Sequence, residues 1–205
     1  TNLVQRGLVW ERARKSGLSK SVNLYVVVPC YNEEAVLHET SKQMLELFGE
    51  MKNDGLINDN SRIVFVDDGS KDKTWSIIDE LTKAHTEISG IKLAKNAGHQ
   101  NALFGGLMTV KDDCDCAISI DADLQDDIHV IPDMVRNFID GYDVVYGVRN
   151  KRDTDTFFKR TTAIGFYKLM QFMGVNIVFN HADYRLMSKR DRKSTRLNSS
   201  HGKLS

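Results

Sequence analysis

The sequence has 205 residues, of which 41% are hydrophobic and 27% are charged, enough for one globular domain with a substantial core. It contains no apolar run of eighteen residues, and its first twenty residues lack the apolar segment of a secretory signal. Cys30, Cys114 and Cys116 form no paired framework, so we expect three reduced thiols in a cytosolic compartment.

The formal net charge of zero hides an uneven distribution of charge along the chain. Residues 1–20 carry a net charge of +4 and residues 189–205 a net charge of +5, whereas residues 21–188 carry −9. An acidic body argues against nucleic-acid binding, which requires a basic face. It fits a protein that recruits a divalent cation to hold an anionic substrate. Ordinary solvated acidic faces explain most of the excess, although not its clustering.

Strand and helix patterns alternate from residue 22 to residue 173. Continuous apolar or β-branched runs predict strands at residues 22–28, 62–66, 91–94, 116–120 and 144–146. Helical spacing of apolar residues predicts helices at residues 33–51, around 75–81, at 100–110, around 132–138 and at 157–173. This alternation is typical of an α/β fold with a mainly parallel sheet.

Polar motifs follow three of these predicted strands, at residues 29–34, 67–70 and 121–125. Ligands of open α/β sheets bind at the carboxyl ends of the strands. We therefore expect the three motifs to contribute to a single site.

The third motif contains Asp121, Asp123 and Gln125, which share a face if the chain stays extended after the strand. Two carboxylates and an amide oxygen are hard ligands that suit Mg²⁺ or Mn²⁺, with substrate phosphates completing the shell. The alternative is a solvated acidic turn before a helix, whose dipole also favours Asp126 and Asp127.

The first two motifs leave more than one interpretation open. Residues 29–34 join a strand to a helix, with Tyr31 available for base stacking, or they form an ordinary helix cap with acidic first-turn residues. Residues 67–70 alone favour a turn with a capping box, and Ser70, Asp72 and Thr74 are all candidate helix caps. His99 begins a predicted helix and either contacts a ligand or is a capping or core histidine.

Together, the three motifs resemble glycosyltransferase family 2, through residues 28–34, 66–74 and 121–126 in that order. Within the family the chain is similar to the polyprenyl-phosphate branch, through residues 96–103, 146–149 and 182–187. The resemblance covers about residues 20–190. It implies a GT-A type fold and an inverting, Mg²⁺- or Mn²⁺-dependent hexosyltransferase. The implied donor is a nucleoside-diphosphate sugar, UDP-glucose-like or GDP-mannose-like, and the implied acceptor is a polyprenyl phosphate at the cytoplasmic face of the membrane.

The resemblance also implies residue roles. Nucleotide-binding positions are Pro29, Tyr31, Glu33, Val66, Asp68, Asp121 and Ala122. Metal and diphosphate positions are Asp121, Asp123 and Gln125; phosphate or acceptor positions are Arg149 and Arg160; the catalytic position is Asp183. A phosphate monoester is mostly ionised near neutral pH, since its second pKa is about 6. Asp183 is therefore expected to orient the acceptor as much as to deprotonate it.

The resemblance divides the chain into a basic, mobile arm at residues 1–20, a catalytic domain at 21–190 that lacks its C-terminal part, and a tail at 191–205. The tail has no hydrophobic periodicity and is expected to be non-native or disordered. The full-length protein is expected to contact the membrane surface. Alternative functions are transfer to a glycan hydroxyl, or nucleotide binding without catalysis. A phosphohydrolase is disfavoured, because its Asp pair would follow the first strand of the domain rather than the fourth.

Overall fold

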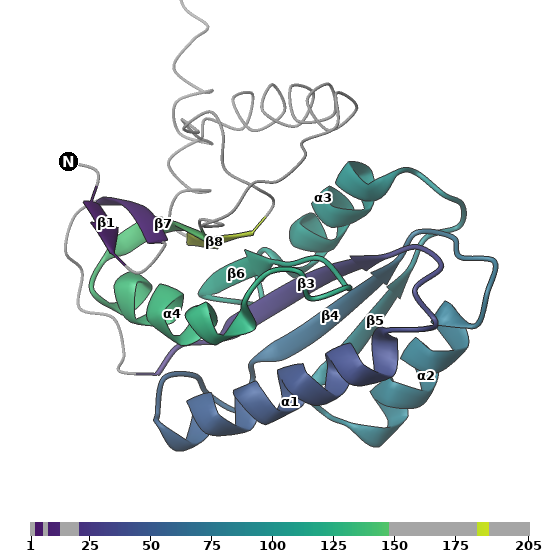
Figure 1. Cartoon of the computed structure of the whole chain (residues 1–205), viewed down its shortest axis with the longest axis horizontal. Coiled ribbons are helices and arrows are strands. Elements are labelled where there is room, and N and C mark those ends of the chain that lie inside the picture. Colours follow the sequence, from purple (N-terminus) through teal and green to yellow (C-terminus); the bar gives the residue numbers. More distant parts are fainter. Residues whose placement is uncertain (1–2, 6–7, 13–20, 148–183, 189–205) are drawn as a thin grey trace, which may run out of the picture.

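The computed structural model describes residues 3–5, 8–12, 21–147 and 184–188. These segments form one eight-stranded mixed sheet with helices on both faces (Figure 1). In spatial order its strands are β1 (Leu3–Gln5), β2 (Leu8–Arg12), β7 (Tyr142–Gly147), β8 (Arg185–Ser188), β6 (Cys116–Ser119), β3 (Leu24–Cys30), β4 (Arg62–Asp67) and β5 (Ile88–Lys92).

The centre of the sheet is parallel. β3 pairs in parallel with β4 on one side and with β6 on the other, so that Val27 is aligned with both Val64 and Ser119. β5 extends this parallel part beyond β4, whereas β8 is antiparallel to both β6 and β7. The predicted α/β class is confirmed. All five predicted strands are present, with boundaries shifted by up to three residues.

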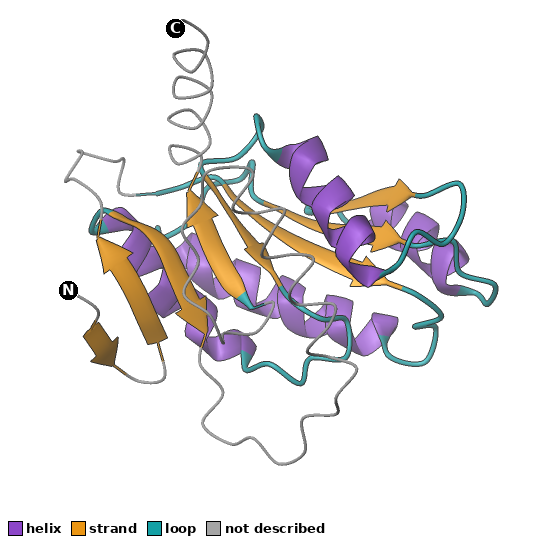
Figure 2. Cartoon of the chain, turned by 90° about the horizontal axis from the view of Figure 1, so that it is seen from above, coloured by secondary structure: helices purple, strands orange, loops and turns teal. Residues whose placement is uncertain are grey.

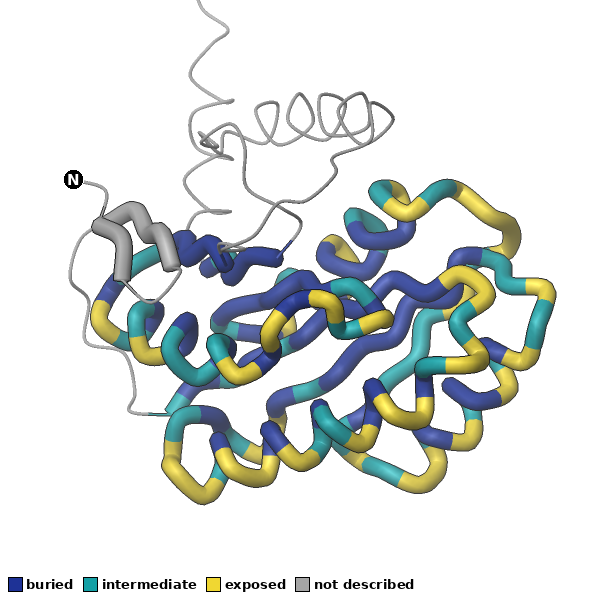
Figure 3. The backbone as a smooth tube through the Cα atoms, viewed as in Figure 1, coloured by how far each residue is buried: buried dark blue, intermediate teal, exposed yellow. Residues whose placement is uncertain are grey.

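Helices α1 (Leu37–Asn53), α2 (Thr74–Ala84) and α4 (Ile131–Ile139) cover one face of the sheet, and α3 (His99–Val110) covers the other (Figure 2). The side chains of β3 alternate accordingly. Val26 and Val28 belong to the core beneath α1, α2 and α4, and Val27 belongs to the core beneath α3. Because both faces are covered, the central strands are buried along their length (Figure 3).

Two features of the sheet differ from the sequence-based expectation. The arm predicted at residues 1–20 contains β1 and β2, and β2 pairs antiparallel with β7, aligning Val9 with Tyr146. β8 was not predicted either, because its four residues are too few to show a period. Such short strands are defined by the neighbour with which they pair rather than by their own pattern.

The helix predicted at 157–173 and the tail at 191–205 lie outside the described residues. In the segments that are described, no helix combines the length and apolarity needed to cross a membrane.

α3 packs closely on the sheet at Gly106. A Cβ atom added there would lie 2.7 Å from Cγ1 of Val27 and 2.7 Å from Cγ2 of Val66, both on buried strands. An added Cβ at the neighbouring Gly105 would meet nothing within 4 Å. The absence of a side chain at Gly106 therefore sets how closely α3 approaches β3 and β4.

We predict that Gly106→Ala lowers the free energy of unfolding by about 1–2 kcal/mol, because overpacking outweighs the gain in helix propensity. Gly105→Ala is the matched control on the same helix and should raise the free energy of unfolding by up to about 1 kcal/mol. Urea denaturation of both variants measures the difference. Equal effects of the two substitutions would contradict the close approach.

Candidate functional site

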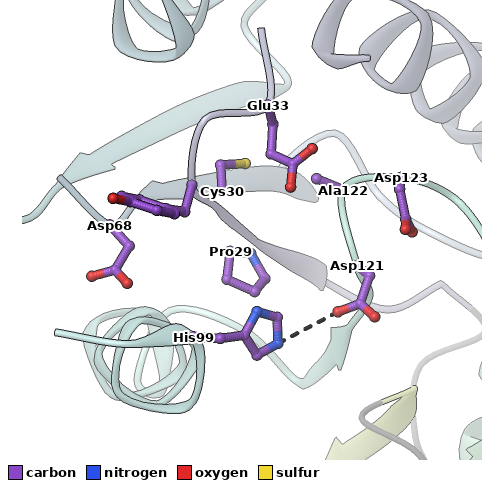
Figure 4. A pocket seen from close by; sticks show the side chains of 9 residues that line it. Pro29, Cys30, Glu33, Asp68, His99, Asp121, Ala122 and Asp123 are labelled. Carbon is purple, nitrogen blue, oxygen red and sulfur yellow. Dashed lines mark ion pairs between the residues drawn. The ribbon is translucent and has the colours of Figure 1, made fainter. Parts of the chain in front are cut away.

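The three polar motifs meet in one cavity of about 230 Å³. It lies where β3, β4 and β6 end and where α3 begins (Figure 4). In the part of the chain that the structure describes, its lining residues are Pro29, Cys30, Tyr31, Glu33, Asp68, His99, Asp121, Ala122 and Asp123.

The loops after β3 and β4 are joined by reciprocal hydrogen bonds. Asn32, in the left-handed region with φ 57°, donates its backbone N–H to Oγ of Ser70 at 3.0 Å. Its own Oδ1 accepts the backbone N–H of Lys71 at 2.9 Å. An asparagine suits this position, because it tolerates the left-handed conformation and its short side chain reaches the neighbouring loop.

The same pattern continues along both loops. Glu33 donates its backbone N–H to Oγ1 of Thr74 at 2.8 Å, and Glu34 donates its backbone N–H to Oδ2 of Asp72 at 3.2 Å. Oε2 of Glu34 in turn accepts the N–H of Lys73 at 2.8 Å. These bonds hold residues 33 and 34 in a turn ahead of α1, which is why α1 begins at Leu37 and not near residue 33 as predicted.

Asp68 connects the end of β4 to the start of α3. The residue is only 2% exposed, and its two carboxylate oxygens accept the backbone N–H groups of Ala97 at 2.6 Å and Gly98 at 3.0 Å. Asp68 therefore fixes the loop that leads into α3 and also lines the cavity. Val66, predicted as a nucleotide-binding position, is instead a fully buried core residue beneath α3 and is absent from the cavity lining.

Negative charge is concentrated on one side of the cavity. Burial raises the pKa of the Glu33 carboxyl above its usual value, and the charges of Asp123 and Asp121 raise it further, whereas His99 opposes the shift. Nε2 of His99 lies 3.4 Å from Oδ1 of Asp121 (Figure 4). Bringing these carboxylates together is unfavourable unless a cation compensates for them.

The chain turns after β6 and does not continue as an extended strand. Leu124 has φ 50°, and its N–H donates to the carbonyl oxygen of Asp121 at 3.4 Å. Oδ1 of Asp123 accepts the N–H of Gln125 at 3.2 Å. The turn brings Asp121 and Asp123 to the cavity, whereas the exposed Gln125 does not line it. The condition for all three side chains to share a face, an extended backbone, is therefore not met.

The donor set can be tested for its fit to a divalent cation. Across the described ranges, no group of three or more His, Cys, Asp or Glu side chains is arranged to hold a metal ion. Mg²⁺, however, is usually held by one or two carboxylates, with substrate phosphates and water completing its shell. Asp121 and Asp123 fit that mode of binding, in a cavity whose carboxylates repel one another.

Cys30 lines the cavity, but burial raises the pKa of its thiol far above the usual value. The thiol therefore stays protonated and is a poor nucleophile. All three cysteines are free, in agreement with the predicted thiols, and all three are buried. Arg149, Arg160 and Asp183 lie outside the described residues, so their roles remain predictions. Ala97 and Gly98, which Asp68 holds, belong to the segment 96–103 that carries the branch resemblance, but the sequence predicted no role for them.

Comparison with known proteins agrees with this architecture. The family model for Glycosyl transferase family 2 matches residues 25–194, so the chain belongs to this family. It is 54% identical to the uncharacterized glycosyltransferase YkoT of Bacillus subtilis over 167 residues, which are 82% of this chain and 50% of YkoT. It is 38% identical to a prophage bactoprenol glucosyl transferase homolog of Escherichia coli over 169 residues, which are 82% of this chain and 53% of that protein.

The chain thus spans about half the length of the curated relatives that it matches. Among solved structures it is similar to S. aureus TarS 1-349 in complex with UDP, with a TM-score of 0.50 and 16% identity. That match covers 85% of this chain and 49% of TarS 1-349. At this identity the likeness supports the GT-A type fold and nothing further.

The contact between the cavity loops depends on Gly69. It has φ +69°, and an added Cβ would lie 2.6 Å from the backbone nitrogen of Asn96. Gly55 has a similar φ of +68°, yet an added Cβ there would meet nothing within 4 Å. The two glycines therefore share the same conformational strain and differ in close contact.

We predict that Gly69→Ala lowers the free energy of unfolding by about 2–4 kcal/mol, the sum of left-handed strain and overpacking. Gly55→Ala should cost only the strain, about 1–2 kcal/mol. Urea denaturation of both variants measures the two costs. Equal losses of free energy in the two variants would show that Gly69 is needed only for its left-handed backbone and not for close contact with Asn96.

Proposed function

We propose that this chain is the donor-binding and catalytic part of an inverting hexosyltransferase that moves a sugar from a nucleoside diphosphate to a polyprenyl phosphate. The observation that carries the proposal is the cavity at the strand ends of a family 2 chain, in which Asp121, Asp123 and Glu33 gather around a space of about 230 Å³. A cavity so rich in carboxylates needs a cation before it can accept an anionic diphosphate.

The two ends of the cavity suit the two parts of the donor. Tyr31 is 42% exposed and offers an aromatic face on which a base can stack, with Pro29 and Asp68 also in the lining. We assign the nucleoside to this end. Asp121 and Asp123 lie across the cavity at the end of β6, and we assign the diphosphate to them.

Mg²⁺ or Mn²⁺ would be held by Asp121 and Asp123, and we omit Gln125 because it is outside the cavity lining. Such an ion supplies charge neutralisation for a diphosphate leaving group. The protein's own task is to hold the two carboxylates ready and to fix the donor's orientation. Asp68 and the interlocked loops provide the rigid frame for that task.

The proposed acceptor follows from the relatives. The 38% identical proteins include the bactoprenol glucosyl transferase of Shigella phage SfV, and bactoprenol is a polyprenol. An ionised phosphate oxygen of the acceptor would attack the anomeric carbon in a single displacement, which inverts its configuration. We propose that Arg149 and Arg160 face the phosphates, that Asp183 orients the acceptor, and that the full-length protein works at the cytoplasmic face of the membrane.

Removing one charge from Asp121 or Asp123 tests the metal site. We predict that Asp121→Asn and Asp123→Asn each reduce the Mn²⁺-dependent gain in UDP or GDP affinity by tenfold or more, because a carboxylate ligand becomes a neutral amide. Calorimetry with and without Mn²⁺ measures this gain.

Asp127→Asn is the matched control for those two variants. Asp127 follows the same strand, but its Oδ1 accepts the N–H of His129 at 2.9 Å in the short helix η1 (Ile128–Val130), away from the cavity lining. It loses the same charge and should keep the Mn²⁺-dependent gain. An equal loss in all three variants would indicate a diffuse charge effect and not a site.

Asp183→Asn in the full-length protein tests the acceptor step. We predict that transfer to polyprenyl phosphate falls while donor affinity is unchanged. The loss should be on the order of a hundredfold if Asp183 accepts a proton, and smaller, decreasing as the pH rises, if Asp183 only orients an acceptor phosphate that is already ionised. Radiolabelled sugar transfer into the lipid fraction measures the rate. Transfer at the wild-type rate would remove Asp183 from the site. Transfer to a glycan hydroxyl, or no turnover by the wild type, would favour the alternative functions.

A further inference from the structure

Thr40 is a buried polar residue of α1 whose hydroxyl bonds to a distant part of the chain. Its Oγ1 donates a hydrogen bond to the backbone carbonyl oxygen of Ala122 at 2.6 Å, across a separation of 82 residues. Thr40 is 2% exposed and Ala122 is 3% exposed, so the bond is buried. Ala122 lies between Asp121 and Asp123, the two carboxylates assigned to the cation, and all three residues line the cavity.

The next residue of α1, Ser41, shows what a hydroxyl inside a helix commonly does. Serine and threonine hydroxyls in helices often donate to a carbonyl oxygen one turn earlier on the same helix. Oγ of Ser41 donates in this way to the carbonyl oxygen of His38 at 2.9 Å. A hydroxyl has one proton to donate, and Thr40 donates it to Ala122. The bond therefore connects α1 to the turn that follows β6.

α1 is a firm anchor for this bond. Leu37, Met44 and Phe48 of the helix are at most 1% exposed and belong to the same core cluster as Ile120 and Ala122. Side chains in a close-packed core interdigitate, so the helix cannot shift without disturbing its neighbours. The donor oxygen of Thr40 is held in place by the helix that carries it.

The segment that Thr40 contacts has less support of its own. β6 ends at Ser119, and Leu124 has φ 50°. The N–H of Leu124 donates to the carbonyl oxygen of Asp121 at 3.4 Å, which is long for a hydrogen bond. Successive Cα atoms are about 3.8 Å apart, so a displacement of Ala122 would move the residues on both sides of it.

We infer that Thr40 is a positioning residue, whose bond to Ala122 sets the backbone from which Asp121 and Asp123 together reach the divalent cation. The role rests on the proposed function, because those two carboxylates are the ligands assigned there. Thr40 acts on the backbone between the two ligands, and its effect is therefore shared by both of them.

The first test removes the hydroxyl and keeps the volume. Thr40→Val replaces Oγ1 with a methyl group of similar size and removes this partner from the carbonyl of Ala122. Calorimetry of UDP and GDP, with and without Mn²⁺, should show about a tenfold loss of the Mn²⁺-dependent gain in affinity, as expected for a group that orients metal ligands. Affinity without Mn²⁺ should be unchanged, because the nucleoside is assigned to the Tyr31 end of the cavity.

Two further variants separate positioning from a general loss of stability. Thr40→Ser restores the hydroxyl and removes only a methyl group, so it should keep the gain even though the lost methyl lowers the melting temperature. Ser41→Ala also removes a buried hydroxyl, but one whose bond lies within α1, so it should keep the gain as well. A purely structural role of Thr40 predicts instead that the gain falls with the melting temperature in all three variants.

Thr40→Ala takes the place of Thr40→Val if the valine variant does not fold. The smaller side chain leaves space for a water molecule to satisfy the carbonyl of Ala122, which lowers the cost of the lost bond. The Mn²⁺-dependent gain should still fall, because a water molecule does not connect the turn to α1.

Four results would overturn the inference: an unchanged gain in Thr40→Val or its alanine substitute, an equal loss with and without Mn²⁺, a loss in Thr40→Ser as large as in Thr40→Val, or the same loss in Ser41→Ala. A wild type that binds nucleotide with no Mn²⁺-dependent gain would overturn both the inference and the metal requirement of the proposed function. A gain that Asp121→Asn loses and Thr40→Val keeps would overturn the inference alone.

Discussion

The cavity depends on one buried carboxylate, that of Asp68. Burying an ionised group is costly unless hydrogen bonds satisfy it, and Asp68 is satisfied by the backbone N–H groups of Ala97 and Gly98. Those bonds join the end of a central strand to the beginning of α3, two elements separated by about thirty residues of chain. The position of the start of α3, and with it of the cavity residue His99, follows from this connection.

The same cavity brings together carboxylates that repel one another. Burial raises the pKa of Glu33 first, and the neighbouring Asp123 and Asp121 add to it. A carboxyl whose pKa is higher in the folded chain than in the unfolded chain binds more protons when folded. Its contribution to the free energy of unfolding therefore decreases as the pH rises through that pKa. The folded protein tolerates an arrangement that a bound cation would relieve, which is typical of a binding site.

Much of the fold could be predicted from the sequence, because the central strands are continuous apolar runs and the helices show a clear period. The start of α1 could not, since it depends on bonds from Glu33 and Glu34 to a loop about forty residues away. The convergence of Asp121 and Asp123 on one cavity followed from strand-end positions. The exclusion of Gln125 did not, because it results from the left-handed backbone at Leu124.

The motifs combine two kinds of residue that sequence reasoning cannot separate. Asn32, Ser70 and Thr74 use their side chains on the facing loop, whereas Tyr31 and Asp123 line the cavity. A strand end offers few positions, so residues that shape the loops alternate closely with residues that face the ligand. Adjacent motif positions therefore have different consequences when they are changed. Loss of a loop contact disturbs every cavity residue, whereas loss of a cavity side chain removes one interaction from an intact frame.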